Sequence, residues 1–408
     1  MKIQFNRTCP THLMQTLALA VLAFLPAVSL HAVGFRLPNQ DPEAIARGNA
    51  FAATADDPSA IYYNPAGITQ LQGENIQAGL YMISLGAEYK SPSGTTAKAD
   101  SDFQPVPQIY YTYSFTNVPI SVGMGIYAPY GLAIDWGNNT SFNTLGESGS
   151  LLYASFNPVV AWRVCKTLSV AIGPTINYSQ ASFKRAIGLS PGDQFSMDGD
   201  GTAFGFNAGI LWQPYSMLSF GVNYRSPTTV NYEGTSHAAP YYPTVSSSAS
   251  INFPQYVVGG ISFRPTTNWN FEVDVDWTDW NSVKQIVFRN TSFGDVPLTL
   301  DYQSSFMYEV GATRQLGGGY FASAGYIYSE NSSPDANFNP LIPDANLQLG
   351  GIGFGHHGRH WDWVIAYQFA YNGGHTVTGS PLSPTGQTAD GTYKTFNNAF
   401  NISATFKF

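Results

Sequence analysis

Three acidic residues alternate with apolar residues in the stretch "NFEVDVDW", namely Glu272, Asp274 and Asp276. A group of carboxylates can act as general acid and general base, so this stretch is a candidate catalytic site. A spacing of two residues, however, places all three on one face of a β-strand, with the aromatic and aliphatic neighbours on the other. The sequence contains no nucleophile elbow and no nucleotide-phosphate loop. We therefore interpret the acids as the polar face of a strand, and we do not expect an enzyme.

The stretch "GHHGRH" holds three histidines, His356, His357 and His360. Imidazoles are common metal ligands, so a metal site is one interpretation. Adjacent residues of a strand point in opposite directions, and no pattern of carboxylates completes a ligand shell here. We predict a solvated turn, without a metal site and without a cofactor.

The composition departs from that of a soluble domain. Charged residues make up 11% of the chain, against roughly 25% in typical soluble proteins, and 15% of the residues are aromatic. Beyond the N-terminus no run of about 18 apolar residues could form a spanning helix. The net charge of -8 gives no electrostatic basis for binding nucleic acid.

The first 32 residues have the pattern of a secretory signal peptide. Lys2 and Arg7 precede an apolar segment from Leu13 to Leu25, and small residues follow it. We predict cleavage after Ala32. Residues 1–32 are thus expected to be absent from the mature protein.

From residue 73 onward, apolar or aromatic residues alternate with small or polar ones. In the last segment Phe400, Ile402 and Phe406 share one face, while Asn401 and Ser403 take the other. A period of two is that of a β-strand between two environments. We predict fourteen such strands. They lie near residues 73–90, 104–116, 119–130, 150–164, 168–187, 200–213, 217–233, 245–264, 267–285, 297–316, 319–331, 345–357, 361–373 and 393–408.

The acidic stretch indicates which face meets which solvent. A charge on the lipid face of a barrel costs up to about 2 to 4 kcal/mol for Lys or Arg at the bilayer centre, and somewhat less for an acid. Glu272, Asp274 and Asp276 are therefore expected to face a watery lumen. The predicted fold is all-β, a 14-stranded antiparallel transmembrane β-barrel formed by residues 73–408.

The connections between the segments alternate in length. Short turns such as 117–118 and 317–318 alternate with long loops such as 131–149 and 374–392. This asymmetry is typical of bacterial outer-membrane barrels. We expect a monomeric, multi-pass barrel in the bacterial cell outer membrane, surrounded by its lipid and lipopolysaccharide. A secreted soluble all-β protein is the alternative architecture.

Residues 33–72 do not alternate and instead contain Ala-rich helical turns. In "NPAG", Asn64 can cap such a turn and Pro65 fixes φ. A barrel of fourteen strands lies between the filled eight-stranded type and the open porins, so its lumen could hold a segment of about 40 residues. We predict that residues 33–72 form a small N-terminal plug inside the barrel.

With these features in place, the mature chain resembles the FadL/TodX-type family of outer-membrane transporters for long-chain fatty acids and hydrocarbons. The stretches that carry the resemblance extend along the whole mature chain and are specific as a set. They are "VGF" at 33–35, "ADD" at 55–57, "NPAGIT" at 64–69, "PYGLAIDW" at 129–136, "NYRSPTTVNYEG" at 223–234, "NFPQYVVGG" at 252–260, "WTDWNSVKQI" at 277–286, "IPDANLQLGGIGFG" at 342–355 and a terminal Phe408.

The resemblance implies passive transport of a hydrophobic small molecule through a plugged barrel with a lateral wall opening. The family's N-terminal hatch carries an Asn-Pro-Ala motif, matched here by Asn64, Pro65 and Ala66. A kinked third strand opens the wall sideways into the membrane. The residues that would weaken its pairing are Gly123, Gly125, Pro129 and Gly131.

Three substrate-binding positions also follow from the resemblance. Phe35 matches an N-terminal Phe that occupies the pocket, and Arg185 matches an inward Arg that meets a ligand carboxylate, although an Arg at a strand end can also be a rim residue. Gln303 stands where fatty-acid members place a second cation. A fatty acid and a neutral alkane or aromatic hydrocarbon both stay open as substrates. The alternative functions are a general diffusion porin and an outer-membrane barrel hydrolase.

Overall fold

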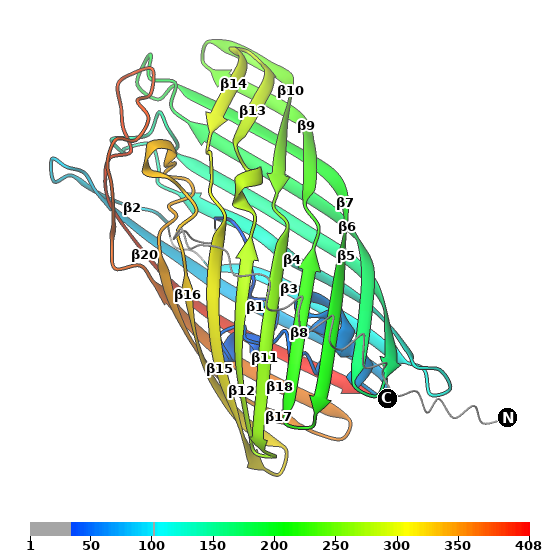
Figure 1. The fold of residues 1–408 in the computed structure, drawn as a ribbon. Coiled ribbons are helices and arrows are strands. Elements are labelled where there is room, and N and C mark those ends of the chain that lie inside the picture. Colours follow the sequence, from blue (N-terminus) through cyan, green and yellow to red (C-terminus); the bar gives the residue numbers. More distant parts are fainter. Residues whose placement is uncertain (1–33, 101–102) are drawn as a thin grey trace.

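The fold is described from a computed structural model, which places residues 34–100 and 103–408 (Figure 1). The predicted signal peptide, residues 1–32, lies outside this range. Within residues 34–100 and 103–408, no helix has the length and apolar character needed to cross a membrane.

Strand segments make up the wall of the molecule. Four barrel strands are interrupted and consist of two consecutive segments each, β8/β9, β10/β11, β12/β13 and β14/β15, while β2 and β19 are short additions beside the loops. The bounds are β1 Gly73–Lys90, β2 Thr96–Lys98, β3 Phe103–Ser114, β4 Ile120–Asp135, β5 Ser148–Cys165, β6 Leu168–Arg185, β7 Gln194–Tyr215, β8 Leu218–Arg225, β9 Thr228–Ala239, β10 Tyr242–Phe253, β11 Tyr256–Thr266, β12 Trp269–Thr278, β13 Gln285–Thr291, β14 Gly294–Thr299, β15 Ser305–Gly317, β16 Tyr320–Ser329, β17 Leu347–His357, β18 Trp361–Tyr371, β19 His375–Val377 and β20 Gly391–Lys407.

Consecutive barrel strands pair antiparallel, and the first strand pairs with the last. The β1–β20 ladder runs from Asn75 opposite Lys407 to Lys90 opposite Thr392, which closes the wall. The predicted fold, a closed antiparallel barrel of fourteen strands, is confirmed.

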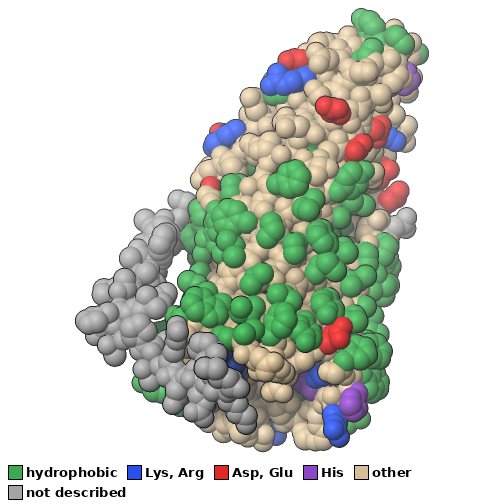
Figure 2. Space-filling model, turned by 90° about the vertical axis from the view of Figure 1, so that its right-hand side faces the viewer, with side chains coloured by type: hydrophobic (Ala, Val, Ile, Leu, Met, Phe, Trp, Pro, Cys, Tyr) green, Lys and Arg blue, Asp and Glu red, His purple; other side chains and the backbone are tan. Residues whose placement is uncertain are grey.

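Outward and inward residues alternate along each strand as the sequence pattern indicates. On β20, Phe400, Ile402 and Phe406 are exposed, whereas Asn401 and Ser403 are buried. The exposed apolar side chains gather in a band over the middle and lower part of the face shown in Figure 2, and the upper part shows fewer of them and several charged side chains. Lipid is the solvent that such a band requires.

The N-terminal segment, residues 34–72, runs through the interior of the barrel (Figure 1). Its helical turns are short: α2 Pro42–Ala46, α3 Ala60–Tyr63 and the 3₁₀ turn η1 Pro65–Gln70. Two further 3₁₀ turns lie between strands, η2 Trp280–Ser282 and η3 Asp335–Asn337. Almost every residue of the segment between 38 and 69 is buried, so strands and segment share one interior.

Inward-facing glycines of the wall make room for the backbone of this segment. A Cβ at Gly221 would collide with the backbone of Ala52, and a Cβ at Gly325 would collide with the backbone of Arg47. Because glycine has no side chain, backbone can approach backbone at these points. At these two points the backbone of the segment is in direct contact with the sheet.

Asn64 fixes the corner between α3 and η1. Its side-chain oxygen accepts a hydrogen bond from the backbone N–H of Ala66 at 3.2 Å, and Pro65 occupies the first position of η1. Its side-chain nitrogen donates to the carbonyl oxygens of Ala52 (2.7 Å) and Ile210 (3.0 Å). One residue thus caps the turn, ties it to an earlier part of the segment and ties both to β7.

The three acids of β12 hold the other side of the segment. Oδ2 of Asp274 accepts from the backbone N–H groups of Phe51 (3.0 Å) and Ala52 (2.8 Å). Oε1 of Glu272 accepts from the N–H groups of Ala53 (2.7 Å) and Thr54 (3.2 Å). The acids therefore satisfy four consecutive backbone donors of a stretch that has no strand or helix partner.

Two arginines of the segment complete this contact and balance part of its charge. Arg47 lies 3.0 Å from Glu272, and Arg36 lies 2.7 Å from Asp276; all four side chains are buried. The expectation that the acids face a watery lumen was therefore wrong in one respect. They do face inward, but the N-terminal segment covers them, because unpaired buried carboxylates would be costly.

Replacing Asp274 by Ala should release residues 51–54 from β12. Hydrogen bonds to a charged group contribute roughly 1.5 to 3 kcal/mol each, and Asp274 accepts two of them. We expect faster amide hydrogen exchange at residues 51–54, measured by mass spectrometry on the detergent-extracted barrel. Asp198→Ala, which removes an exposed acid of β7, is the matched control; equal exchange in the two variants would show that Asp274 does not hold the segment.

Candidate binding cavity and wall gap

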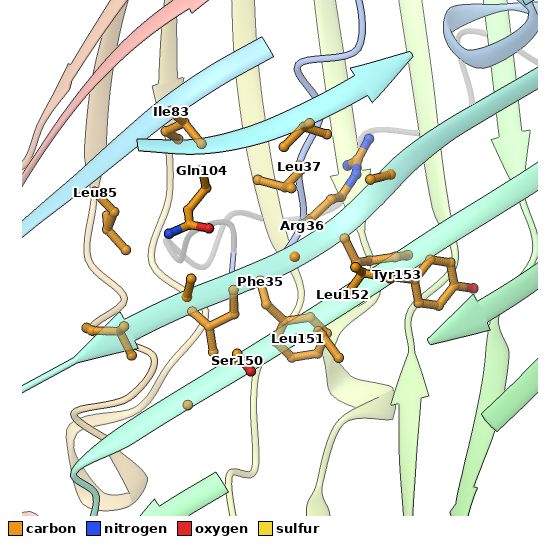
Figure 3. A pocket seen from close by; sticks show the side chains of 18 of the residues that line it. Phe35, Arg36, Leu37, Ile83, Leu85, Gln104, Ser150, Leu151, Leu152 and Tyr153 are labelled. Atoms are coloured by element: carbon orange, nitrogen blue, oxygen red, sulfur yellow. The ribbon is translucent and has the colours of Figure 1, made fainter. Parts of the chain in front are cut away.

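A cavity of about 1210 Å³ lies between residues 34–39 and the wall strands that include β1, β3, β4 and β5 (Figure 3). Apolar surface predominates in its lining, which also carries neutral polar side chains such as Gln104 and eight charged side chains. Apolar side chains that line it include Leu37, Ile83, Leu85, Val106, Leu132, Leu151 and Ile327. A cavity of this size and character suits a small or medium-sized apolar molecule.

Phe35 belongs to an aromatic cluster at this cavity. Its ring centroid lies 4.9 Å from that of Trp280, 5.6 Å from that of Phe253 and 6.1 Å from that of Tyr130. Only 4% of Phe35 is exposed. Edge-to-face aromatic contacts of this kind hold the N-terminus against the wall.

Two charged groups beside the cavity, Arg36 and Asp344, are bonded within the protein. The Arg36 guanidinium binds Asp276 and Thr278, at 2.7 and 2.8 Å, and lies over the ring of Tyr256. The Asp344 carboxylate accepts hydrogen bonds from the backbone N–H and the hydroxyl of Ser332 (3.0 and 2.6 Å), and burial raises its pKa. Among the described lining residues, the other cation is Lys184, which is exposed.

The structure brings only one of the three predicted substrate-binding residues to the cavity. Phe35 lines it, whereas Arg185 and Gln303 do not. Arg185 ends β6, donates to the carbonyl oxygen of Thr144 at 3.2 Å and lies over the ring of Phe195. Gln303 is exposed between β14 and β15, and its backbone N–H donates to Ser332.

The wall is incomplete between β3 and β4 beside the cavity. Their ladder runs from Ser114 opposite Ser121 to Ile109 opposite Ile126 and stops there. Residues 103–108 pair only with β1, and residues 130–135 of β4 pair with β5 but not with β3. Residues of both unpaired stretches line the cavity.

We define the wall gap as residues 103–108 of β3 and 127–135 of β4, which do not pair with each other. Prolines lie on both sides of this gap. Pro105 and Pro107 belong to β3, and Pro129 belongs to a register shift in β4 between Tyr127 and Tyr130. A proline has no N–H to donate and is confined to edges and bulges of sheets. The two edges are thus built so that they do not join.

The N-terminal segment occupies the free edge of β4 from inside. Arg36 forms an antiparallel bridge with Tyr130, in which Leu37 N–H donates to the Pro129 oxygen (2.9 Å) and Gly131 N–H donates to the Phe35 oxygen (3.0 Å). Residues 35–37 therefore supply the backbone partners that β3 does not.

Gln40 adds a side-chain contact to the same edge. Its amide nitrogen donates to the carbonyl oxygens of Leu37 (2.8 Å) and Ala128 (2.7 Å), and its amide oxygen accepts from the Ala128 N–H (3.3 Å). A glutamine amide can act as donor and acceptor at once, so it can replace a missing strand partner at the register shift. We call residues 35–37 together with Gln40 the edge latch.

The four predicted wall-opening residues fall into two pairs. Gly123 and Gly125 lie in the paired half of β4, where Ile61 of α3 packs against them; Pro129 and Gly131 lie in the unpaired half. A Cβ at Gly131 would press on the side chain of Leu37, so this glycine makes room for the edge latch.

The histidine stretch forms the turn between β17 and β18, but His357 is not simply solvated. Its ring nitrogens lie 3.5 Å from a carboxylate oxygen of Glu43 in α2 and 3.5 Å from one of Asp362. The described residues contain no group of three or more His, Cys, Asp or Glu that could hold a metal ion. His357 connects the N-terminal segment to the barrel rim.

Sequence reasoning missed the edge latch and the role of Pro105 and Pro107. The prolines carried a usable signal, since "PVP" inside an otherwise regular strand indicates an edge. Leu37 and Gln40 carried none, because their partners are backbone atoms of residues distant in the chain.

Comparison with known proteins places this architecture among transport proteins. The family model described as "Outer membrane protein transport protein (OMPP1/FadL/TodX)" matches residues 23–408. The long-chain fatty acid transport protein of Escherichia coli K12 is 23% identical over 382 residues, covering 80% of this chain and 85% of its own.

Two solved structures share the fold. A Pseudomonas aeruginosa FadL homologue has a TM-score of 0.82 at 17% identity, covering 92% of this chain and all of its own. The toluene transporter TodX of Pseudomonas putida has a TM-score of 0.71 at 14% identity, covering 93% of this chain and 99% of its own. The closed barrel, the cavity and the match across nearly the whole sequence agree: this chain belongs to the OMPP1/FadL/TodX family of outer-membrane transport proteins for hydrophobic substrates.

Proposed function

We propose that this protein carries neutral apolar molecules passively from the cell exterior into the cavity and releases them sideways, through the wall gap, into the outer membrane. The observation that supports this most directly is the interrupted β3–β4 ladder beside an apolar cavity. A broken ladder in a membrane wall leaves backbone groups without strand partners, which is costly in lipid. Because this interruption lies beside the cavity, we infer that it serves the passage of the substrate.

A sideways exit suits the physical properties of the substrate. Transfer of apolar surface from water to hydrocarbon is favourable by about 25 cal/mol per Å². A molecule that left through a watery lumen would lose this free energy, whereas one that passes through the wall gap keeps it. Transport can then be driven by partition alone, without a cofactor.

The charges beside the cavity favour a neutral substrate over a fatty acid. A buried carboxylate needs a partner, because desolvating it is costly. Of the two cations in the described lining, Arg36 is committed to Asp276 and Thr278, and Lys184 is exposed, while Arg185 lies away from the lining. The same lining carries six acidic side chains, which oppose the entry of an anion. The carboxylate of Asp344 would repel a second anion. Both fatty acids and toluene are named as substrates of similar proteins, and the lining supports the neutral class.

In this proposal the N-terminal segment is the hatch, and the edge latch is its moving contact. Arg36, Leu37 and Gln40 must leave the free edge of β4 before a substrate can pass. Asn64, Pro65 and Ala66 shape the part of the segment that stays seated against β7. Phe35 closes the cavity until a substrate displaces it.

Neither alternative function has comparable support. A general diffusion porin needs an open lumen, and the burial of most of residues 38–69 supports an obstructed one. A hydrolase would need a Ser or Asp beside a His on the outer rim or face, whereas the histidine stretch 356–360 lies at the short turn between β17 and β18. The acids Glu272, Asp274 and Asp276 are bonded to the N-terminal segment. We expect the protein to work as a monomer among outer-membrane lipid and lipopolysaccharide.

The wall gap can be tested by restoring strand pairing. Replacing both Pro105 and Pro107 by Val supplies two N–H donors to β3 and should narrow the gap. We expect toluene uptake by cells that depend on this protein to fall several-fold, with the amount of protein in the outer membrane unchanged.

The matched control is the pair Pro158→Val and Pro174→Val. These prolines lie where the β5–β6 ladder is also interrupted, but they do not line the cavity. Their replacement should leave uptake unchanged. Undiminished uptake in the Pro105/Pro107 variant, or an equal loss in both, would argue against exit through the wall gap.

Truncating Phe35 tests the hatch. Phe35→Ala should weaken the seating of the N-terminus, since removing a buried aromatic side chain costs about 3 to 5 kcal/mol. We expect more frequent channel openings in planar-bilayer recordings of the purified protein. Phe204→Ala, which removes a lipid-exposed ring of β7, is the control. If channel openings are no more frequent in Phe35→Ala than in the control, Phe35 does not close the cavity.

A further inference from the structure

One corner of the cavity is polar without being charged. Gln368 of β18 and Asn397 of β20 both line the cavity. Each carries an amide atom that is buried and has no hydrogen-bond partner among the described residues, Nε2 of Gln368 and Oδ1 of Asn397. Buried polar atoms are nearly always bonded, so an unpaired donor and an unpaired acceptor beside the same cavity call for an explanation.

The orientation of Gln368 follows from its neighbours. The side-chain nitrogen of Asn49 donates to the oxygen of Asn39 (2.8 Å), and the nitrogen of Asn39 donates to Oε1 of Gln368 and to the hydroxyl of Tyr81 (both 2.9 Å). This chain of bonds uses the oxygen of Gln368. Its nitrogen, on a side chain that is 3% exposed, is left for another partner.

Register brings Asn397 to the same corner. Ala399 lies directly opposite Gln368 across the β18–β20 ladder, and Asn397 is two residues further along the same face. Such diagonal neighbours are about 7 to 8 Å apart, within reach of long side chains. On the other side of β20, Ile83 and Leu85 of β1 lie opposite Ala399 and Asn397 and provide an apolar surround.

We propose that this corner binds the hydroxyl group of a neutral, otherwise apolar substrate, an alcohol or a phenol. The hydroxyl accepts a hydrogen bond from Nε2 of Gln368 and donates one to Oδ1 of Asn397. This inference rests on the proposed function and narrows its substrate class. A hydroxyl is donor and acceptor at once, which matches one free donor and one free acceptor, whereas a carboxylate cannot donate to Asn397 and a hydrocarbon can do neither.

Three ligands with the same 4-ethylphenyl body but different head groups test the proposal. They are 4-ethylphenol, 4-ethyltoluene and 4-ethylbenzoate, which carry a hydroxyl, a methyl and a carboxylate at the same ring position. Their dissociation constants would be measured by isothermal titration calorimetry on the full protein in lipid nanodiscs. We expect the wild-type protein to bind both neutral ligands and to bind 4-ethylbenzoate most weakly.

The variants Gln368→Met and Asn397→Leu keep side-chain volume and remove the free donor or acceptor. Loss of one hydrogen bond should weaken 4-ethylphenol about tenfold in each variant and leave 4-ethyltoluene within about twofold. Asn401→Leu is the matched control: it lies on the same strand and face, its amide atoms also lack partners, and it does not line the cavity. It should change neither ligand.

The outcomes separate this inference from the proposed function. Equal losses for the two neutral ligands, or none for either, would overturn the hydroxyl site while the transport proposal stands, and the two amides would then bind water only. Failure of both neutral ligands to bind the wild-type protein would overturn the transport proposal and this inference with it. Folding of each variant is checked by its heat-modifiable mobility in gels.

Discussion

Lipid offers no hydrogen-bond partner, so every backbone N–H and C=O in the wall of this protein must be satisfied by the protein itself. The β1–β20 ladder meets this requirement by closing the sheet. Between β3 and β4 the requirement is met differently, because residues 35–37 and Gln40 take the place of a strand on the β4 side. The N-terminus is thereby part of the wall as well as part of the interior, and any movement of it changes how the wall is satisfied.

Polar and apolar contacts together hold the N-terminal segment against the wall. Asp274 and Glu272 accept four backbone N–H groups, and Asn64 adds bonds to Ala52 and to β7. Hydrogen bonds of this kind contribute modestly in net terms, because water can replace each partner when the contact opens. Apolar side chains of the segment, such as Phe51, Ile61 and Ile68, also pack in a buried cluster with wall residues such as Tyr110 and Leu211. Phe35 belongs to a separate aromatic cluster and lines the cavity.

The period of two in the sequence was sufficient to predict the barrel, since burial on β20 follows the parity of residues 396–408. Local chemistry likewise predicted the turn at Asn64 and Pro65. The rule that acids avoid lipid correctly predicted that the Asp274 side chain faces inward. It could not predict the hydrogen bonds to Phe51 and Ala52, because the alternation of residues along a strand says nothing about what lies inside the barrel. Arg185 lies at the end of β6 beside Thr144 and Phe195 and not in the cavity lining, because its position depends on surrounding loops that no periodicity encodes. The edge latch joins residues that are far apart in the chain, and single residues such as Leu37 do not reveal such pairings.

The glycines that receive the N-terminal backbone also constrain how the molecule assembles. Gly221, Gly325 and Gly351 come so close to residues 45–52 that little space separates the segment from the sheet. The segment precedes β1 in the chain, and β1 is one side of the closing seam with β20. Because that seam joins the two ends of the barrel sequence, its loop-closure entropy is the largest of any strand pair, and it is expected to form late. The segment is then expected to enter the curled, still open sheet before the β1–β20 pairing forms. The close contacts at these glycines thus constrain the order in which the barrel assembles.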